Sequence, residues 1–333
     1  MSKNSRLPVI ISLSILFCLN LLMVSSVAPN QFFKQLAAWI IGLILFFVGT
    51  QINPKQLKNS HRFLFLFSCF ILTIPILLNN ITRGSRRWIE LGPFPAIQPS
   101  EIVKPLLLIF LSHTQYPFLV FIPVAIIMAQ PDLGSAISVL SLLIPFIFYN
   151  KKLFKLTIIL SFVMLLISPI IWKNVLHNYQ KSRILNFINP ASDPLGKGYN
   201  VIQSKIAIGS SGFWGKGYKK GSQGQLLFLP EKHTDFMFAA TTEELGVLGV
   251  VLILSAYYLL IKSLINRAFS QTNNRILFLF TLGIAFQIWV QTFINIGMNI
   301  GILPVTGIPL PFLSVGGSSL MTLLFSIGII FSS

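Results

Sequence analysis

Residues 8–27 read PVIISLSILFCLNLLMVSSV, an apolar run of twenty residues that follows Lys3 and Arg6. A helix of about 20 apolar residues is long enough to cross the hydrocarbon core of a bilayer. A secretory signal peptide has a similar charge pattern, and Ser26 and Ala28 would suit its cleavage site. Its apolar core, however, is usually only about 7–15 residues long. We therefore predict that this run is an uncleaved first transmembrane helix.

The rest of the chain repeats this pattern. Its 333 residues are 54% hydrophobic and only 10% charged, with a mean hydropathy of +0.77. One soluble core could not bury so many apolar runs, so the sequence predicts an all-α polytopic membrane protein in which residues 1–333 form a single integral membrane domain. We expect about ten transmembrane helices, at Pro8–Val27, Phe33–Thr50, Phe63–Leu78, Ile102–Ser112, Phe118–Ala129, Leu133–Phe148, Leu156–Trp172, Phe236–Ile261, Ile276–Ile296 and Ser318–Ile330.

Basic residues assign the predicted loops to two sides of the membrane. With the N-terminus inside, the short cytoplasmic segments hold eleven cations and no acidic residue, as the positive-inside rule expects. These cations are Lys3, Arg6, Lys55, Lys58, Arg62, Lys151, Lys152, Lys155, Lys262, Arg267 and Arg275. Both termini are then cytoplasmic. The segments Asn79–Ser100, 173–235 (the large extracytoplasmic loop) and Gly301–Gly317 face outward, and their apolar residues indicate packed loops.

The acidic residues are few and lie in the middle part of the sequence. All eight lie between Glu90 and Glu244, and ionisable groups at membrane depth are costly enough to suggest function. Glu101 and Lys104 are three residues apart, so they share one helix face. They form either a neutralised structural pair or part of a polar cavity wall, and Pro105 indicates a locally broken helix there.

Two aspartates precede apolar runs. Asp132 stands just before an apolar run, so we predict that it is an ordinary helix cap. Asp235 stands in the stretch Leu229-Pro-Glu-Lys-His-Thr-Asp-Phe, where Thr234 or Asp235 could also be a cap. The helix dipole would favour an ionised Asp235, and an ionised carboxylate there could act as a general base towards a hydroxyl.

Cations and glycines accumulate in the outer loops. The cations are Arg83, Arg86, Arg87, Lys181, Arg183, Lys197, Lys205, Lys216, Lys219, Lys220 and Lys232. Such a run is often a solvated face, but the glycines of residues 209–221 would let backbone amides approach an anion closely. This combination suits an anionic lipid headgroup such as a pyrophosphate. Cys18 and Cys69 lie inside apolar runs, so we predict no metal site.

Six motifs occur in order over nearly the whole chain. They are Gly84-Ser-Arg-Arg-Trp-Ile-Glu-Leu-Gly, Gln98-Pro-Ser-Glu-Ile-Val-Lys, Gln130-Pro-Asp-Leu-Gly-Ser, Tyr199-Asn-Val-Ile-Gln-Ser-Lys-Ile-Ala-Ile-Gly-Ser, Leu229-Pro-Glu-Lys-His-Thr-Asp-Phe and Glu243-Glu-Leu-Gly. Together they resemble the SEDS family, the shape, elongation, division and sporulation proteins. The segments starting at Gly221 and Ile296 look like the RodA-like elongation branch. The chain departs from the family at Val315, where Tyr is usual, and in a shorter stretch between Lys104 and Gln130.

The resemblance implies a peptidoglycan glycosyltransferase of the bacterial cytoplasmic (inner) membrane. Such a protein polymerises lipid II during cell elongation, with its active site on the extracytoplasmic side, alongside a class B penicillin-binding protein and the elongation machinery. No nucleic acid is expected. Asp235 matches the family's essential acid and would be the catalytic base. No cofactor is demanded by the residues, although a divalent cation is compatible with the chemistry. The substrate-binding or cavity residues that we predict are Glu101, Lys104, Arg86, Arg87, Lys205, Gln203, Ser204, His233 and Asp132.

Two other functions use the same features. A lipid II flippase or transporter would also need the buried pair and a basic outer vestibule. It would need polar groups at both leaflets, however, and the predicted cytoplasmic loops hold no acidic residue. A non-catalytic scaffold that only activates its penicillin-binding partner would tolerate every acidic substitution that leaves the partner contact intact.

Overall fold

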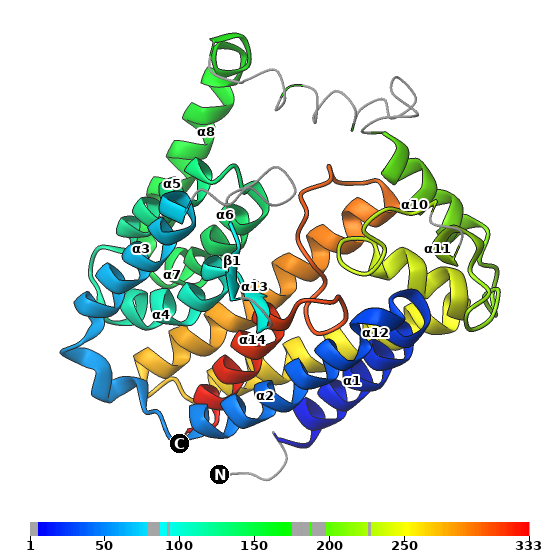
Figure 1. The fold of residues 1–333 in the computed structure, drawn as a ribbon. Coiled ribbons are helices and arrows are strands. Elements are labelled where there is room, and N and C mark those ends of the chain that lie inside the picture. Colours follow the sequence, from blue (N-terminus) through cyan, green and yellow to red (C-terminus); the bar gives the residue numbers. More distant parts are fainter. Residues whose placement is uncertain are drawn as a thin grey trace.

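The chain is a bundle of helices (Figure 1), seen in a computed structural model that describes residues 6–78, 87–91, 94–174, 181, 187, 198–225 and 228–332. The α-helices are α1 (Leu7–Val27), α2 (Phe32–Thr50), α3 (His61–Leu78), α4 (Pro99–His113), α5 (Phe121–Ala129), α6 (Leu133–Leu140), α7 (Ile144–Tyr149), α8 (Lys151–Asn174), α10 (Tyr199–Gly209), α11 (Ser222–Gln225), α12 (Met237–Phe269), α13 (Arg275–Ile300) and α14 (Gly317–Ile330). Short 3-10 turns are η2 (Pro29–Gln31), η3 (Pro54–Lys58), η4 (Pro117–Val120) and η5 (Ser141–Leu143).

Length and hydropathy identify the membrane segments. Within the described residues, six helices are long and apolar enough to cross a bilayer, namely Leu7–Val27, Pro29–Thr50, His61–Leu78, Lys151–Ile170, Met237–Phe269 and Arg275–Ile300. Three shorter apolar segments, Pro117–Ala129, Leu133–Tyr149 and Gly317–Ile330, and the buried α4 account for the remaining predicted spans. The prediction of an all-α polytopic membrane protein is confirmed.

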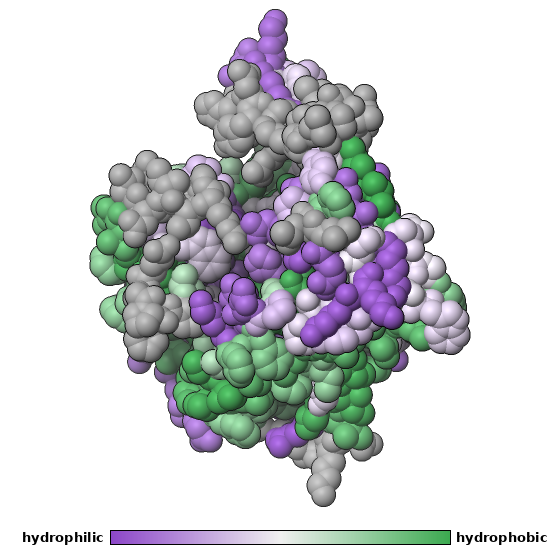
Figure 2. All heavy atoms as spheres, turned by 45° about the vertical axis from the view of Figure 1, so that its right-hand side comes forward, coloured by the Kyte–Doolittle hydropathy of each residue, from purple (hydrophilic) through white to green (hydrophobic). Residues whose placement is uncertain are grey.

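The surface has the pattern of a membrane protein. Figure 2 shows hydrophobic residues gathered over the lower part of one face, with hydrophilic residues above them and a smaller hydrophilic group beneath. Many large apolar side chains of α2, α3 and α8 are exposed. Such exposure is unusual for a soluble protein and is expected where acyl chains cover the helices.

Close helix packing shelters the short α14. Glycines let two helix backbones approach, which is how transmembrane helices commonly associate. α2 and α14 lie side by side (Figure 1), and a Cβ at Gly328 would come within 2.1 Å of the Phe46 carbonyl oxygen. A Cβ at Gly49 would lie 2.5 Å from the Phe325 carbonyl oxygen. The short α14 is therefore packed closely against α2.

Two predictions about helices were wrong. The predicted span Leu133–Phe148 is not one helix, because it consists of α6, η5 and α7. Pro145 cannot donate the backbone hydrogen bond that a continuous helix needs there. Conversely, α4 continues through Pro105 from Pro99 to His113, so that proline does not break the helix.

One loop contains strands that the sequence analysis did not predict. β1 (Ile89–Leu91) and β2 (Phe94–Ile97) pair antiparallel, with Ile89 opposite Ile97 and an irregularity before Leu91. β2 leads directly into α4, so this short hairpin fixes where α4 begins. The large loop contributes α10 and α11, while its residues 175–180, 182–186, 188–197, 226 and 227 lie outside the described part of the chain.

Candidate active site

Asp235 is held in place through its backbone. It lies in the turn before α12, and its carbonyl oxygen accepts hydrogen bonds from Asn295 Nδ2 at 2.9 Å and Asn299 Nδ2 at 3.0 Å. Both asparagines belong to α13 and are completely buried. Asn299 Oδ1 also accepts the backbone N–H of Ala239 at 3.1 Å. Two amide side chains of one rigid helix therefore position the aspartate and the first turn of α12.

The loop between α13 and α14 closes over the same turn. Val315 N donates to the His233 carbonyl oxygen at 2.8 Å, and the Ser314 hydroxyl donates to the Thr234 carbonyl oxygen. At Gly307, where φ is 73°, a Cβ would lie 3.5 Å from Asp235 Oδ2. The glycine therefore gives the loop its left-handed turn beside the carboxylate. This loop, part of the segment Gly301–Gly317, forms one wall of the site.

Glu101 and Lys104 form the predicted pair on one face of α4. Lys104 Nζ lies 2.6 Å from Glu101 Oε1, and Lys104 is fully buried. The Ser138 hydroxyl accepts hydrogen bonds from Lys104 Nζ at 3.1 Å and from Gln291 Nε2 at 2.7 Å. Glu101 Oε2 is buried without a hydrogen-bond partner. The pair is thus part of a polar chain that links α4, α6 and α13.

Asp132 caps α6 and also binds side chains from two other segments. Its carboxylate accepts the backbone N–H of Ser135 at 3.1 Å and the Ser135 hydroxyl at 2.7 Å, which confirms the predicted cap of α6. It also accepts Gln98 Nε2 at 3.2 Å and pairs with Arg87 NH1 at 3.2 Å. The strand segment, α4 and α6 are therefore tied together at this carboxylate.

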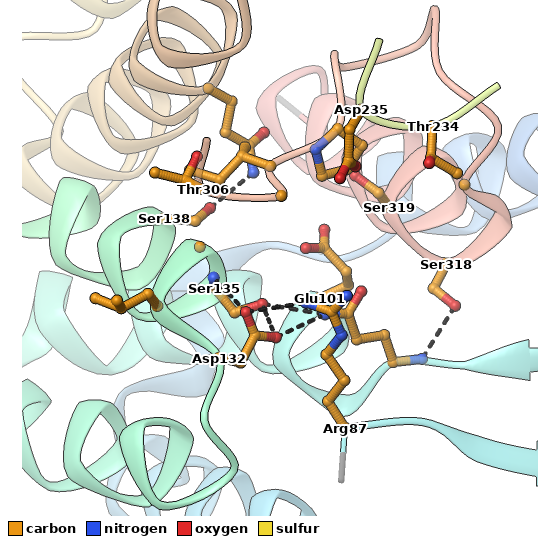
Figure 3. Close-up of a pocket in the computed structure, with 18 of the residues that line it drawn as sticks. Arg87, Glu101, Asp132, Ser135, Ser138, Thr234, Asp235, Thr306, Ser318 and Ser319 are labelled. Atoms are coloured by element: carbon orange, nitrogen blue, oxygen red, sulfur yellow. Dashed lines mark hydrogen bonds and ion pairs between the residues drawn. The ribbon is translucent and has the colours of Figure 1, made fainter. Parts of the chain in front are cut away.

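These groups surround one pocket. Figure 3 shows Asp235, Glu101, Asp132 and Arg87 around a common space, and the pocket that they line has a volume of about 370 Å³. The polar members come from the β1 region, α4, α6, the turn before α12, α13 and the α13–α14 loop. A polar cavity with a carboxylate fixed at its wall is able to orient a hydroxyl and remove its proton.

Two deeper glutamates fasten the large loop. Glu243 is fully buried and accepts Lys216 Nζ at 2.7 Å, Gln223 N at 2.9 Å and Gly224 N at 3.1 Å. Glu244 accepts the backbone N–H of Lys219 at 3.1 Å and, from α1, the Ser26 hydroxyl at 2.6 Å. Both acids follow Asp235 closely in the sequence, and the structure joins them to the loop that carries the cations.

The large loop contacts α12 at the point where that helix is interrupted. α12 is interrupted at Gly246, where φ is 63°. Val247 N donates to the Phe213 carbonyl oxygen at 3.0 Å, and Lys216 N donates to the Glu243 carbonyl oxygen at 2.9 Å. A Cβ at Gly246 would lie 2.4 Å from the Phe213 carbonyl oxygen, so only glycine fits this close contact.

The basic residues of the loop are therefore not all free to meet an anion. Lys216 is paired with Glu243. The Lys232 ammonium donates to the Gly224 carbonyl oxygen, and burial lowers its pKa, with the charge of Glu244 acting in the opposite direction. Lys219 and Lys220 remain exposed.

The predicted site residues fall into three groups. Asp235, Glu101, Asp132 and Arg87 line the pocket, and Lys104 is buried against Glu101. Ser204 donates to the Asn299 carbonyl oxygen at 2.7 Å, away from the pocket lining. Gln203, Lys205 and His233 are also outside that lining, and Arg86 lies outside the described residues. Substrate binding by all of these residues stays a prediction.

The sequence analysis missed a polar stripe on α13. Gln287, Gln291, Asn295 and Asn299 recur every fourth residue, so they lie on one helix face, and all four are at least 98% buried. Amide side chains at this spacing within an apolar helix were the available signal. Buried polar groups need partners, and here the last three meet the site.

The comparisons agree with this architecture. A family model described as a cell cycle protein of the FtsW/RodA/SpoVE type matches residues 4–332. The peptidoglycan glycosyltransferase MrdB of Escherichia coli (strain K12) is 38% identical over 315 residues, which cover 90% of this chain and 84% of that protein.

Two solved structures are also similar. A chain from a peptidoglycan synthase complex, solved to show the structural coordination of polymerization and crosslinking, has a TM-score of 0.83 and 30% identity, covering 97% of this chain and 96% of that chain. The crystal structure of the rod shape determining protein RodA of Thermus thermophilus has a TM-score of 0.70 and 25% identity, covering 97% of this chain and 94% of that chain. The matched residues extend over nearly the whole sequence. The chain belongs to the FtsW/RodA/SpoVE family.

Proposed function

We propose that Asp235 is the general base of a glycosyl transfer that polymerises lipid II into glycan strands. The chain is a peptidoglycan glycosyltransferase of the elongation type, the activity named for its Escherichia coli relative. The observation that carries the assignment to Asp235 is its position. Two buried asparagines fix its backbone at the wall of a polar pocket.

The reaction needs one base and one stabilised leaving group. The Asp235 carboxylate removes the proton from the 4-hydroxyl of the acceptor's N-acetylglucosamine. The oxygen then attacks the anomeric carbon of the donor's N-acetylmuramic acid. The new C–O bond forms as the bond to undecaprenyl pyrophosphate breaks, with inversion at that carbon. General base catalysis of this kind typically contributes about 10²–10⁴-fold to the rate.

A pyrophosphate leaving group reduces the need for a second catalytic acid, because it departs as a stable anion. Cations that meet its developing charge would assist the departure. Lys205, Lys219 and Lys220 are exposed on the loop region and are suited to this role. A divalent cation is compatible with the scheme, and no step here depends on one. Among the described residues, no three His, Cys, Asp or Glu side chains are grouped to hold a metal ion.

The membrane setting and the partner follow from the same proposal. The protein is a membrane protein, and the distribution of cations supports a pocket on the extracytoplasmic side of a bacterial inner membrane. The similarity to a chain of a peptidoglycan synthase complex supports a class B penicillin-binding protein as partner, within the elongation machinery.

The test is polymerisation by purified protein. It is incubated with lipid II, with and without its cognate penicillin-binding protein carrying an inactivated transpeptidase, and the products are separated on a gel. Moenomycin is included to inhibit contaminating class A glycosyltransferases. We expect polymer that persists with moenomycin. No polymer in either setting, from folded protein, would contradict the proposal and favour lipid transport or scaffolding.

A further inference from the structure

The pocket lining is rich in acidic residues, whereas the chain as a whole is basic. The chain carries a formal charge of +17 with only eight acidic residues, yet four of these, Glu101, Asp132, Glu231 and Asp235, line the pocket. Within the described part of the chain, Arg87 is the basic residue in its lining, and Asp132 neutralises it. The buried Lys104 also pairs with Glu101, and the lining presents more hydrogen-bond acceptors than cations, which suits uncharged groups that donate hydrogen bonds.

Two residues of the pocket lining, one on α4 and one on α13, each carry a hydrogen-bond acceptor without a partner. Glu101 Oε1 binds Lys104, while Glu101 Oε2 has no hydrogen-bond partner. Gln291 Nε2 binds Ser138, while Gln291 Oε1 has none. Glu101 is 4% exposed and Gln291 1% exposed, and both line the pocket. Buried polar atoms in folded proteins usually have a partner, and because both of these residues line the pocket, a bound group with two donors can supply it.

We propose that this wall is a subsite for the acceptor sugar, in which Glu101 Oε2 and Gln291 Oε1 accept hydrogen bonds from its hydroxyl or acetamido N–H groups. The inference rests on the proposed function. In the donor, the pyrophosphate is attached to the reacting carbon and would lie among the carboxylates. The acceptor's terminal sugar is separated from its own pyrophosphate by a second sugar, so it enters an acidic pocket without that anion.

Gln291 is then a specificity-determining residue of the transfer. A site built to hydrogen-bond a substrate OH or NH discriminates strongly against an analogue that lacks the group, because the protein acceptor is left unpaired. Replacing Gln291 by leucine removes the acceptor. The variant should therefore lose the preference for the group that Gln291 binds, and not only lose activity.

The experiment varies the acceptor at a constant donor. A labelled 4-deoxy lipid II, which can donate but not accept, is supplied with unlabelled lipid II or with unlabelled acceptors lacking the 3-hydroxyl, the 6-hydroxyl or the 2-acetamido group of the terminal sugar, and only transfer of the label is counted. kcat/KM for each acceptor is measured with the wild-type protein and with Gln291→Leu. We expect at least one analogue to be about 10-fold or more worse than lipid II for the wild type, and that ratio to approach one in Gln291→Leu.

Two variants separate recognition from folding. Gln287→Leu is the matched control, because Gln287 lies one turn away on α13, is equally buried, also has an unpartnered Oε1 and does not line the pocket. It should discriminate as the wild type does. Gln291→Glu keeps an acceptor of the same shape and should retain the discrimination that Gln291→Leu loses.

The outcomes also separate this inference from the proposed function. Absence of polymer from the wild type would overturn both. Polymerisation by the wild type with unchanged analogue ratios in Gln291→Leu would overturn the inference alone. The inference would also be overturned if Gln287→Leu lost discrimination as fully as Gln291→Leu, since a general disturbance of α13 would then explain the effect.

Discussion

At the scale of single residues, the proposed role of Asp235 depends on how its backbone is held in place. Its side chain is short, so the position of its carboxylate follows its backbone closely. Asn295 and Asn299 bind that backbone from one face of α13. In a membrane protein, an interhelical hydrogen bond contributes only about 0.6 kcal/mol on average to stability. The larger consequence of these contacts is therefore expected in catalysis, where geometry matters more.

Substituting Asn295 should lower catalysis without unfolding the protein. Its Nδ2 donates to the carbonyl oxygens of Asp235 and Ile308, so Asn295→Leu frees the turn and the loop beside it. A displacement of about 1 Å can cost about 10²-fold in rate. We expect kcat for lipid II polymerisation to fall about 10–100-fold with a nearly unchanged KM. Gln287→Leu, on the same stripe, serves as the control, and equal losses in both variants would contradict the positioning role.

The sequence identified part of this arrangement. The charged residues Asp235, Glu101 and Asp132 were recognisable because carboxylates are rare in this chain. The amide stripe of α13 was not recognised, although its spacing of four was visible. The convergence of Asp235 and Gln291 depends on tertiary packing. Local sequence does not specify which helices meet, so single residues were predicted better than their contacts.

At the scale of elements, the interruption of α12 joins the membrane bundle to the large loop. Gly246 breaks the helix, and the freed backbone binds residues 213–217. Glu243 then accepts hydrogen bonds from the loop side chain Lys216 and from two loop backbone N–H groups. The start of this helix was predicted from its apolar run, but its kink depends on the loop that fills it.

Removing the Glu243 carboxylate should loosen the loop. In Glu243→Leu, the N–H groups of Gln223 and Gly224 lose their acceptor, at a cost of about 1–3 kcal/mol for each buried group. Because 1–2 kcal/mol changes an equilibrium by about 5–30-fold, trypsin should cleave after Lys219 or Lys220 at least about 5-fold faster. Ser255→Ala, on an exposed part of α12, should leave the cleavage rate unchanged. Equal protection in both variants would show that Glu243 does not fasten the loop.

At the scale of the whole molecule, apolar and charged residues set the overall organisation. Ten apolar runs predicted ten helical segments, because a backbone buried in lipid must satisfy its own hydrogen bonds and a helix does so within one segment. The exceptions follow from local chemistry, since Pro145 interrupts the sixth segment and the β1–β2 pair forms outside the apolar runs. The two faces of the membrane were assigned from loop charge alone.

This orientation predicts a labelling pattern. In a background with Cys18→Ser and Cys69→Ser, a membrane-impermeant maleimide should label Lys220→Cys in intact spheroplasts. Lys152→Cys, in the first turn of α8, should react only after permeabilisation. Both positions are exposed, so access to solvent is comparable. The reverse pattern would place the pocket on the cytoplasmic side and contradict the proposed orientation.

The measurement that tests the central claim most directly is the polymerisation rate of Asp235→Asn, with its penicillin-binding partner present. The amide preserves the shape of the side chain but cannot accept the proton. We predict a thermal unfolding temperature near that of the wild type and a rate lower by about 10²–10⁴-fold. A folded Asp235→Asn protein that polymerises lipid II at the wild-type rate would contradict the assignment of Asp235 as the catalytic base.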